Sequence, residues 1–131
     1  MLQILFLLLT LINLHREDNG APPLSHQPAL SILSQQRCLQ QIANNTNSLS
    51  HEGLQIGVGE NLAGGFTNPD NVFSAWRASP GHNDNMLYPN YQVTGLALCH
   101  GGFYGTYWVN NFALTPVLVK QAWLNVITEQ E

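Results

Sequence analysis

Apolar positions recur at helical spacing in two stretches of the first 45 residues. Residues 5–19 change from apolar to polar along their length, and Gly20 follows at a position where helices commonly end. Residues 27–43 begin with Pro28 in what would be the first helical turn, and their apolar positions form one broad face. The pattern therefore predicts two helices. The apolar positions of the second are Ala29, Leu30, Leu33, Cys38, Leu39 and Ile42.

The middle of the chain is rich in glycine and asparagine. Residues 44–65 have no sustained periodicity and predict mainly loop. The pair Asn68-Pro69 is typical of a helix start, and it predicts a short helix through Trp76. Residues 79–81, Ser-Pro-Gly, should end that helix, and residues 82–87 should form a further short turn.

Two strands are predicted near the end of the chain. Residues 92–99 and 106–113 are rich in Val, Tyr, Trp, Phe and Leu, and glycines in residues 100–105 suit a hairpin connection. Residues 117–127 could add a short amphipathic segment. Helices followed by an antiparallel hairpin indicate an α+β fold.

The first twelve residues are apolar except for Gln3 and Thr10. This stretch is shorter than the about 20 residues of a membrane-spanning helix. It has the length of a signal-peptide core but lacks a preceding basic segment and a following small-residue cleavage site. We favour the start of a buried helix, with a truncated leader over residues 1–7 as the alternative. The expected organisation is this segment, one domain over residues 8–115 and a tail over 116–131.

Charge restricts the classes of partner. Only 9% of the residues are charged and the net charge is −4, whereas about a quarter of residues are charged in an average domain. Binding to nucleic acid or anionic lipid needs clustered Lys and Arg, so we expect neither, and any contact with lipid should be apolar. The cations are Arg16, Arg37, Arg77 and Lys120.

Cysteine content leaves two alternatives open. Cys38 and Cys99 could form one disulfide, or they could be two buried thiols that pack as small apolar side chains. Asn44-Asn45-Thr46 would be a glycosylation sequon at Asn44 only if the source is eukaryotic and the chain is secreted.

Two motifs are more specific than these patterns. Gly-Glu-Asn-Leu-Ala at 59–63 resembles a signature segment of the CAP superfamily, which comprises cysteine-rich secretory, antigen 5 and pathogenesis-related 1 proteins. Residues 75–87, with Trp76 and the run Ser-Pro-Gly-His, resemble a second segment of its compact bacterial-type members. Residues 11–24, 50–51 and 107–112 are similar to further parts of the family pattern in the same order, so the resemblance covers roughly residues 8–113.

The resemblance implies a three-layer α-β-α sandwich with a small antiparallel sheet and a shallow cleft. It places His51, Glu60 and His82 in that cleft, together with Asn61 and Ser79. Larger members carry a second Glu near the position of Ser79, so this cleft is one carboxylate short of the pair that acid–base catalysis commonly uses.

Two interpretations of the cleft stay open. The polar side chains could form a structural network that fixes the loops. Alternatively, the neutral rings of His51 and His82 could bind Zn²⁺ or another divalent metal. The neighbouring pairs Ser25-His26 and Ser50-His51 do not by themselves indicate a nucleophile.

Three hypotheses for function follow. The leading one is an extracellular or cell-envelope protein that binds a lipid- or sterol-like molecule, or a protein, without catalysis and without a required cofactor. The second is a metal-dependent hydrolase using His51, Glu60 and His82. The third is a structural subunit of a surface assembly, because the apolar N-terminus and low charge suit packing against copies of the chain. We expect Glu52, His15, His26 and His100 at the surface, and Phe103 and Tyr104 exposed on the hairpin.

Overall fold

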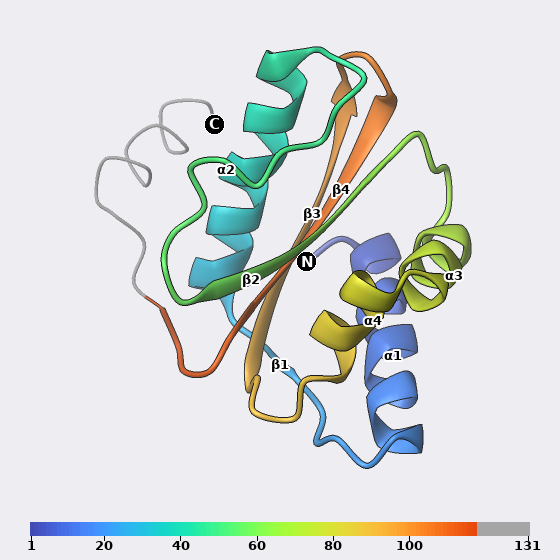
Figure 1. Ribbon diagram of the computed structural model, residues 1–131, viewed down its shortest axis with the longest axis vertical. Helices are drawn as coiled ribbons and strands as arrows, with labels where there is room; N and C mark the ends of the chain where they lie inside the picture. Colours follow the sequence, from blue (N-terminus) through green and yellow to red (C-terminus); the bar gives the residue numbers. More distant parts are fainter. Residues whose placement is uncertain (118–131) are drawn as a thin grey trace.

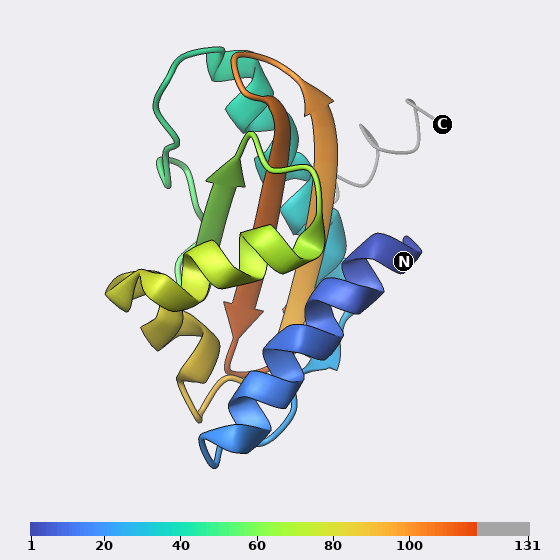
Figure 2. The same ribbon diagram turned by 90° about the vertical axis from the view of Figure 1, so that its right-hand side faces the viewer.

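The computed structural model describes residues 1–117, so the segment predicted at 117–127 lies outside the described residues apart from Val117. A four-stranded sheet separates two helical layers (Figures 1 and 2). Helix α2 (Pro28–Asn44) covers one face of the sheet, and α1 (Gln3–Asp18), α3 (Pro69–Ala78) and α4 (Pro80–Leu87) cover the other. This arrangement confirms the predicted α-β-α sandwich.

The helices begin and end at residues that the sequence marks. Gly20 adopts a φ of 79° two residues after α1 ends, and it accepts the left-handed backbone at little steric cost. The Oδ1 atom of Asn68 accepts a hydrogen bond from the backbone N–H of Asn71, which caps α3 as predicted. Residues 82–87 belong to helix α4, which starts earlier than the predicted turn because Pro80 suits a first helical position.

The sheet has the strand order β1-β3-β4-β2. Strands β3 (Val93–Gly101) and β4 (Gly105–Ala113) form the predicted hairpin. Strand β2 (Val58–Gly64) pairs antiparallel with β4, and the two-residue β1 (Ser25–His26) pairs parallel with β3. The sheet is therefore mixed rather than wholly antiparallel.

Strand β2 corrects the prediction that residues 44–65 are mainly loop. The sequence pattern does not indicate this strand, because polar and small residues occupy its centre. Glu60 and Asn61 are almost fully buried there, and their side chains form hydrogen bonds with side-chain and backbone groups of other elements. Hydrophobic alternation cannot reveal a strand whose buried positions are polar.

A separate core lies on each face of the sheet. The core under α1, α3 and α4 is built on large side chains, and the core under α2 contains Leu62, Tyr107 and Val109. Cys38 of α2 and Cys99 of β3 form a disulfide within the second core, which decides between the two alternatives for the cysteines. Gly95 has no side chain where the backbone of Leu30 crosses β3, so α2 can approach the sheet closely.

Arg16 of α1 is fully buried and joins the loop after its own helix to the end of α4 and the loop that follows it. Its Nε donates to the carbonyl of Pro22 at 2.7 Å, and its Nη1 donates to the carbonyls of Met86 and Tyr88 at 2.8 and 3.0 Å. Burial lowers the pKa of Arg16. None of the helices in residues 1–117 is long and apolar enough to cross a bilayer.

Candidate functional site

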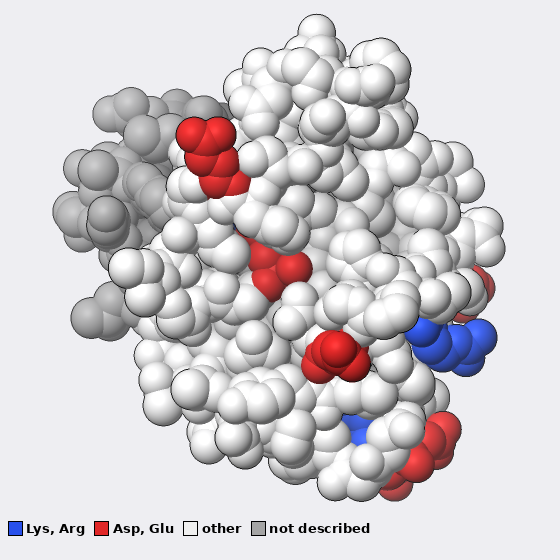
Figure 3. Space-filling view, viewed as in Figure 1, with Lys and Arg blue, Asp and Glu red and all other residues white. Residues whose placement is uncertain are grey.

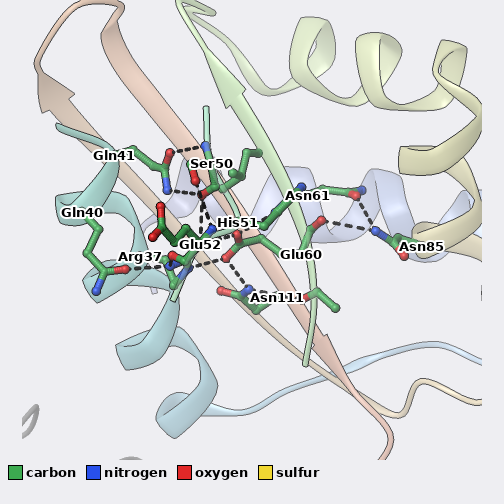
Figure 4. A network of polar contacts seen from close by, with 12 residues as sticks. Arg37, Gln40, Gln41, Ser50, His51, Glu52, Glu60, Asn61, Asn85 and Asn111 are labelled. Atoms are coloured by element: carbon green, nitrogen blue, oxygen red, sulfur yellow. Dashed lines mark hydrogen bonds and ion pairs between the residues drawn. The ribbon is translucent and has the colours of Figure 1, made fainter. Parts of the chain in front are cut away.

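Glu60 and Arg37 form a buried ion pair at the centre of the predicted site (Figure 4). Arg37 Nε and Nη2 each donate to one carboxylate oxygen of Glu60 at 2.8 Å. The remaining N–H groups of Arg37 donate to Gln40 Oε1 and to the carbonyls of Ser50 and Glu52. All five guanidinium N–H groups are therefore used, which is the geometry that gives Arg–carboxylate pairs their specificity.

The carboxylate of Glu60 is saturated as well, in the sense that all of its acceptor positions are occupied. Its Oε1 also lies 2.9 Å from His51 Nδ1, and its Oε2 accepts from Asn111 Nδ2 at 2.9 Å. With the two bonds from Arg37, these contacts occupy the about four lone-pair positions of a carboxylate. Burial alone would raise the pKa of Glu60, but the hydrogen bonds from Arg37, Asn111 and His51 lower the pKa overall.

His51 and His82 reach the site from opposite sides of β2. The side chain of His51 is 59% exposed and belongs to the loop before the strand. His82 is half-buried at the start of α4, and its Nδ1 lies 2.8 Å from Ser79 Oγ. Burial and the charge of His51 lower the pKa of His82, so the neutral ring is favoured.

Two asparagine contacts fix α4 against β2. Asn61 Nδ2 donates to the carbonyl of His82 at 3.0 Å, and Asn85 Nδ2 donates to Asn61 Oδ1 at 3.0 Å. Asn61 is fully buried. Figure 4 shows the contact between Asn61 and Asn85. The position of His82 is therefore set by a residue of the strand as well as by its own helix.

A cleft of about 250 Å³ opens beside this edge of the sheet. Ser79 and His82 are part of its wall, and most of its other lining is apolar or aromatic. The face in Figure 3 carries separate acidic side chains on a mostly uncharged surface. Among residues 1–117, Arg77 is the one exposed Lys or Arg, so this surface has little to attract an anionic partner. The apolar lining comprises Leu49, Leu62, Ala63, Phe66, Ala75, Trp76 and Tyr104.

A larger groove of about 560 Å³ runs along α1 between Phe6 and Pro23. It is mostly apolar and contains none of the cleft residues that the sequence predicts. Of the five predicted cleft residues, Ser79 and His82 line the smaller cleft, whereas His51, Glu60 and Asn61 do not. The smaller cleft is the stronger candidate site, because it combines an apolar wall with these two polar side chains.

The residues of the site fit a tightly bound metal poorly. Nδ1 of each histidine already contacts a neighbour, so only Nε2 of His51 and of His82 could bind an ion. Within residues 1–117, no three or more His, Cys, Asp and Glu side chains are grouped to hold one. Zinc sites in proteins use three or four protein ligands, and Glu60 would have to leave Arg37 to become the third.

Sequence reasoning missed the residues that hold Glu60, above all Arg37 and Asn111. A signal for Arg37 was present, because Ser34, Arg37 and Gln41 follow one helical face and all three are buried. Their spacing matches the apolar positions of α2, which places a charged side chain towards the core. Such a residue needs a buried partner.

The predicted exposure of six other residues is confirmed for some and corrected for others. Glu52, His100 and Phe103 are exposed as expected. His15 and His26 are only half-exposed, because His15 contacts Asn83 and His26 contacts Ser31, each at 2.8 Å. Tyr104 is also half-buried, since its ring lies against the cleft and its hydroxyl donates to the carbonyl of Asn47 at 2.7 Å.

Comparison with known proteins agrees with this fold. The model of CAP, the cysteine-rich secretory protein family, matches residues 9–112. The uncharacterised protein YkwD of Bacillus subtilis is 28% identical over 117 residues, which cover 78% of this chain and 44% of that protein. The chain thus spans less than half the length of that relative.

Solved structures show the same fold. An outer surface protein of Borrelia burgdorferi superimposes with a TM-score of 0.72 at 17% identity, covering 84% of this chain and 91% of that one. An extracellular SCP-domain protein of Bacillus anthracis has a TM-score of 0.64 at 20% identity, covering 82% and 39%. Because the family model matches most of the chain, the chain belongs to the CAP family.

Proposed function

We propose that this CAP domain acts outside the cytoplasm as a binding module, and that its cleft takes a small apolar ligand such as a short acyl chain. The observation that carries the proposal is an apolar cleft lined by part of β2, the strand whose residue Glu60 has every acceptor position of its carboxylate occupied. A carboxylate with no vacant acceptor position is poorly suited to abstract a proton or ligate a metal. Its contacts instead fix the loop and the strand beside the cleft.

The size and lining of the cleft support a short ligand. Pockets for drug-sized molecules have volumes of about 300–1,000 Å³, whereas this cleft measures about 250 Å³. Leu62, Trp76 and Tyr104 offer apolar surface to the ligand. Each methylene buried there would contribute about 0.8 kcal/mol, so a chain of a few carbons should bind with modest affinity.

Two observations support a location outside the cytoplasm. The Cys38–Cys99 disulfide is buried and intact, and such bonds persist mainly in oxidising compartments. The similar structures include an outer surface protein and an extracellular protein. An extracellular or cell-envelope location follows as part of the proposal.

Filling the cleft should weaken binding of an apolar ligand. Ala75 lines the cleft, so a phenylalanine there would occupy ligand space. We expect Ala75→Phe to weaken binding of ω-bromooctanoic acid by about tenfold or more, which corresponds to ~1.4 kcal/mol. Binding can be measured by quenching of tryptophan fluorescence, because Trp76 lines the same cleft and bromine quenches at contact.

A matched control is available one residue away. Ser74 is exposed on the same helix and does not line the cleft, so Ser74→Phe adds the same ring and should leave the affinity unchanged. Octanoic acid without bromine should compete without quenching. Equal affinities of Ala75→Phe and the unmodified protein, or the absence of saturable quenching, would contradict the proposal.

A further inference from the structure

The hydroxyl of Ser79 is oriented towards the ring of His82 rather than towards the backbone N–H groups of the helix that it precedes. Ser79 directly precedes α4, a position from which serine usually caps the first turn. Its side chain makes no capping hydrogen bond, and its Oγ instead lies 2.8 Å from His82 Nδ1. With the ring proton on Nε2, the hydroxyl donates to Nδ1, which is the contact between a serine nucleophile and its base.

A second serine–histidine pair shows what distinguishes this one. Ser31 Oγ lies 2.8 Å from His26 Nε2, the same separation as in the first pair. The Ser31 hydroxyl, however, accepts the backbone N–H of Leu96 at 3.1 Å and lines neither described cavity. Ser79 and His82 both line the 250 Å³ cleft. Only the Ser79–His82 pair is therefore open to a substrate in a described cavity.

The surroundings of His82 hold it in place as a base. Its backbone carbonyl accepts a hydrogen bond from the buried Asn61. Its ring is half-buried against the apolar wall, and the pKa of His82 is lowered, so the ring is neutral at physiological pH and able to accept a proton.

We propose that Ser79 and His82 are the nucleophile and the general base of an acyl-transfer site that cleaves short-chain esters bound in the cleft. The inference rests on the proposed function, because the apolar wall must hold the acyl chain. It needs neither the saturated Glu60 nor a metal ion.

Each bond change can be assigned to a residue. Ser79 Oγ attacks the carbonyl carbon of the ester and forms a new C–O bond, while its proton passes to His82 Nδ1. The ester C–O bond then breaks, and the departing alcohol takes that proton from His82. Water, deprotonated by His82, attacks the acyl-serine; the Ser79 Oγ–acyl bond breaks, Oγ regains the proton, and the carboxylic acid leaves.

Covalent labelling tests the pair directly. We expect a short-chain alkyl fluorophosphonate to add one phosphonyl group per chain, detected by intact mass spectrometry and located on Ser79 by peptide mapping. Ser79→Ala should abolish the adduct and reduce hydrolysis of p-nitrophenyl butyrate to the buffer rate. His82→Gln should lower the rate of hydrolysis by about 100-fold or more.

Ser31 serves as the internal control, because its pair has the same separation outside the cleft. Three results would overturn the acyl-transfer site. They are an adduct shared equally by Ser31 and Ser79, the absence of any adduct, and hydrolysis by Ser79→Ala at the rate of the unmodified protein. Retained binding of ω-bromooctanoic acid together with an unlabelled Ser79 would overturn this site and leave the proposed function standing. Absence of saturable fatty-acid binding would instead count against the proposed function itself.

Discussion

Replacing Arg37 with methionine should lower the free energy of unfolding by about 3–5 kcal/mol. The guanidinium is fully buried, and its five N–H groups hold Glu60, the side chain of Gln40 and two loop carbonyls. Methionine fills much of the same volume but leaves the buried carboxylate without its cation. Urea unfolding followed by circular dichroism would measure the loss.

Two controls distinguish the effect of breaking the ion pair from the effect of removing any arginine. Arg77 is exposed on α3, where it lies 5.4 Å from the centre of the Phe73 ring, so Arg77→Met should change the stability by less than about 1 kcal/mol. Combining Arg37→Met with Glu60→Met should recover part of the loss, because no unpaired charge then stays buried. A stability of Arg37→Met close to that of the unmodified protein would contradict the structural role of the pair.

Reduction of the Cys38–Cys99 disulfide should have an effect of similar size. The two residues are separated by 61 positions, and closing a loop of this length stabilises the folded state by about 4 kcal/mol in the chain-entropy model. Small domains are stable by about 5–15 kcal/mol in total. The reduced protein should therefore unfold at a much lower urea concentration than the oxidised one.

The comparison needs a variant that cannot re-oxidise. Replacing both cysteines with alanine should give a midpoint close to that of the reduced protein, since Cys38 and Cys99 are buried and alanine keeps the core apolar. An unchanged midpoint after complete reduction would show that the bond does not stabilise the domain. The expected loss fits a protein that folds and works in an oxidising compartment.

Much of the fold could be predicted because its elements have strong local signals. Helix α2 has a broad apolar face, and α3 begins at Pro69 with Asn68 as its cap. Strand β4 is rich in β-branched and aromatic residues, and β3 is mainly apolar. Strand β2 could not be predicted in the same way. Its centre is polar, and it exists because α2, β4 and α4 supply partners for those polar side chains.

The candidate site depended on the family resemblance rather than on periodicity. The resemblance directed attention to His51, Glu60 and His82, but it did not show that Arg37 and Asn111 occupy the carboxylate. Along the chain, Arg37 is 23 positions and Asn111 is 51 positions away from Glu60. Side-chain pairing over such separations is set by the packed tertiary structure, which single-sequence patterns do not encode.

The proposed ligand site is the apolar cleft. A crystal structure of the protein with ω-bromooctanoic acid tests this assignment most directly. The anomalous signal of bromine locates the end of the acyl chain without assumption about its pose. We predict a single strong bromine peak in the cleft, in contact with Leu62, Trp76 and Tyr104. A peak only in the groove along α1, beside Phe6 and Leu9, or no bound bromine at saturating ligand, would contradict the assignment of the cleft.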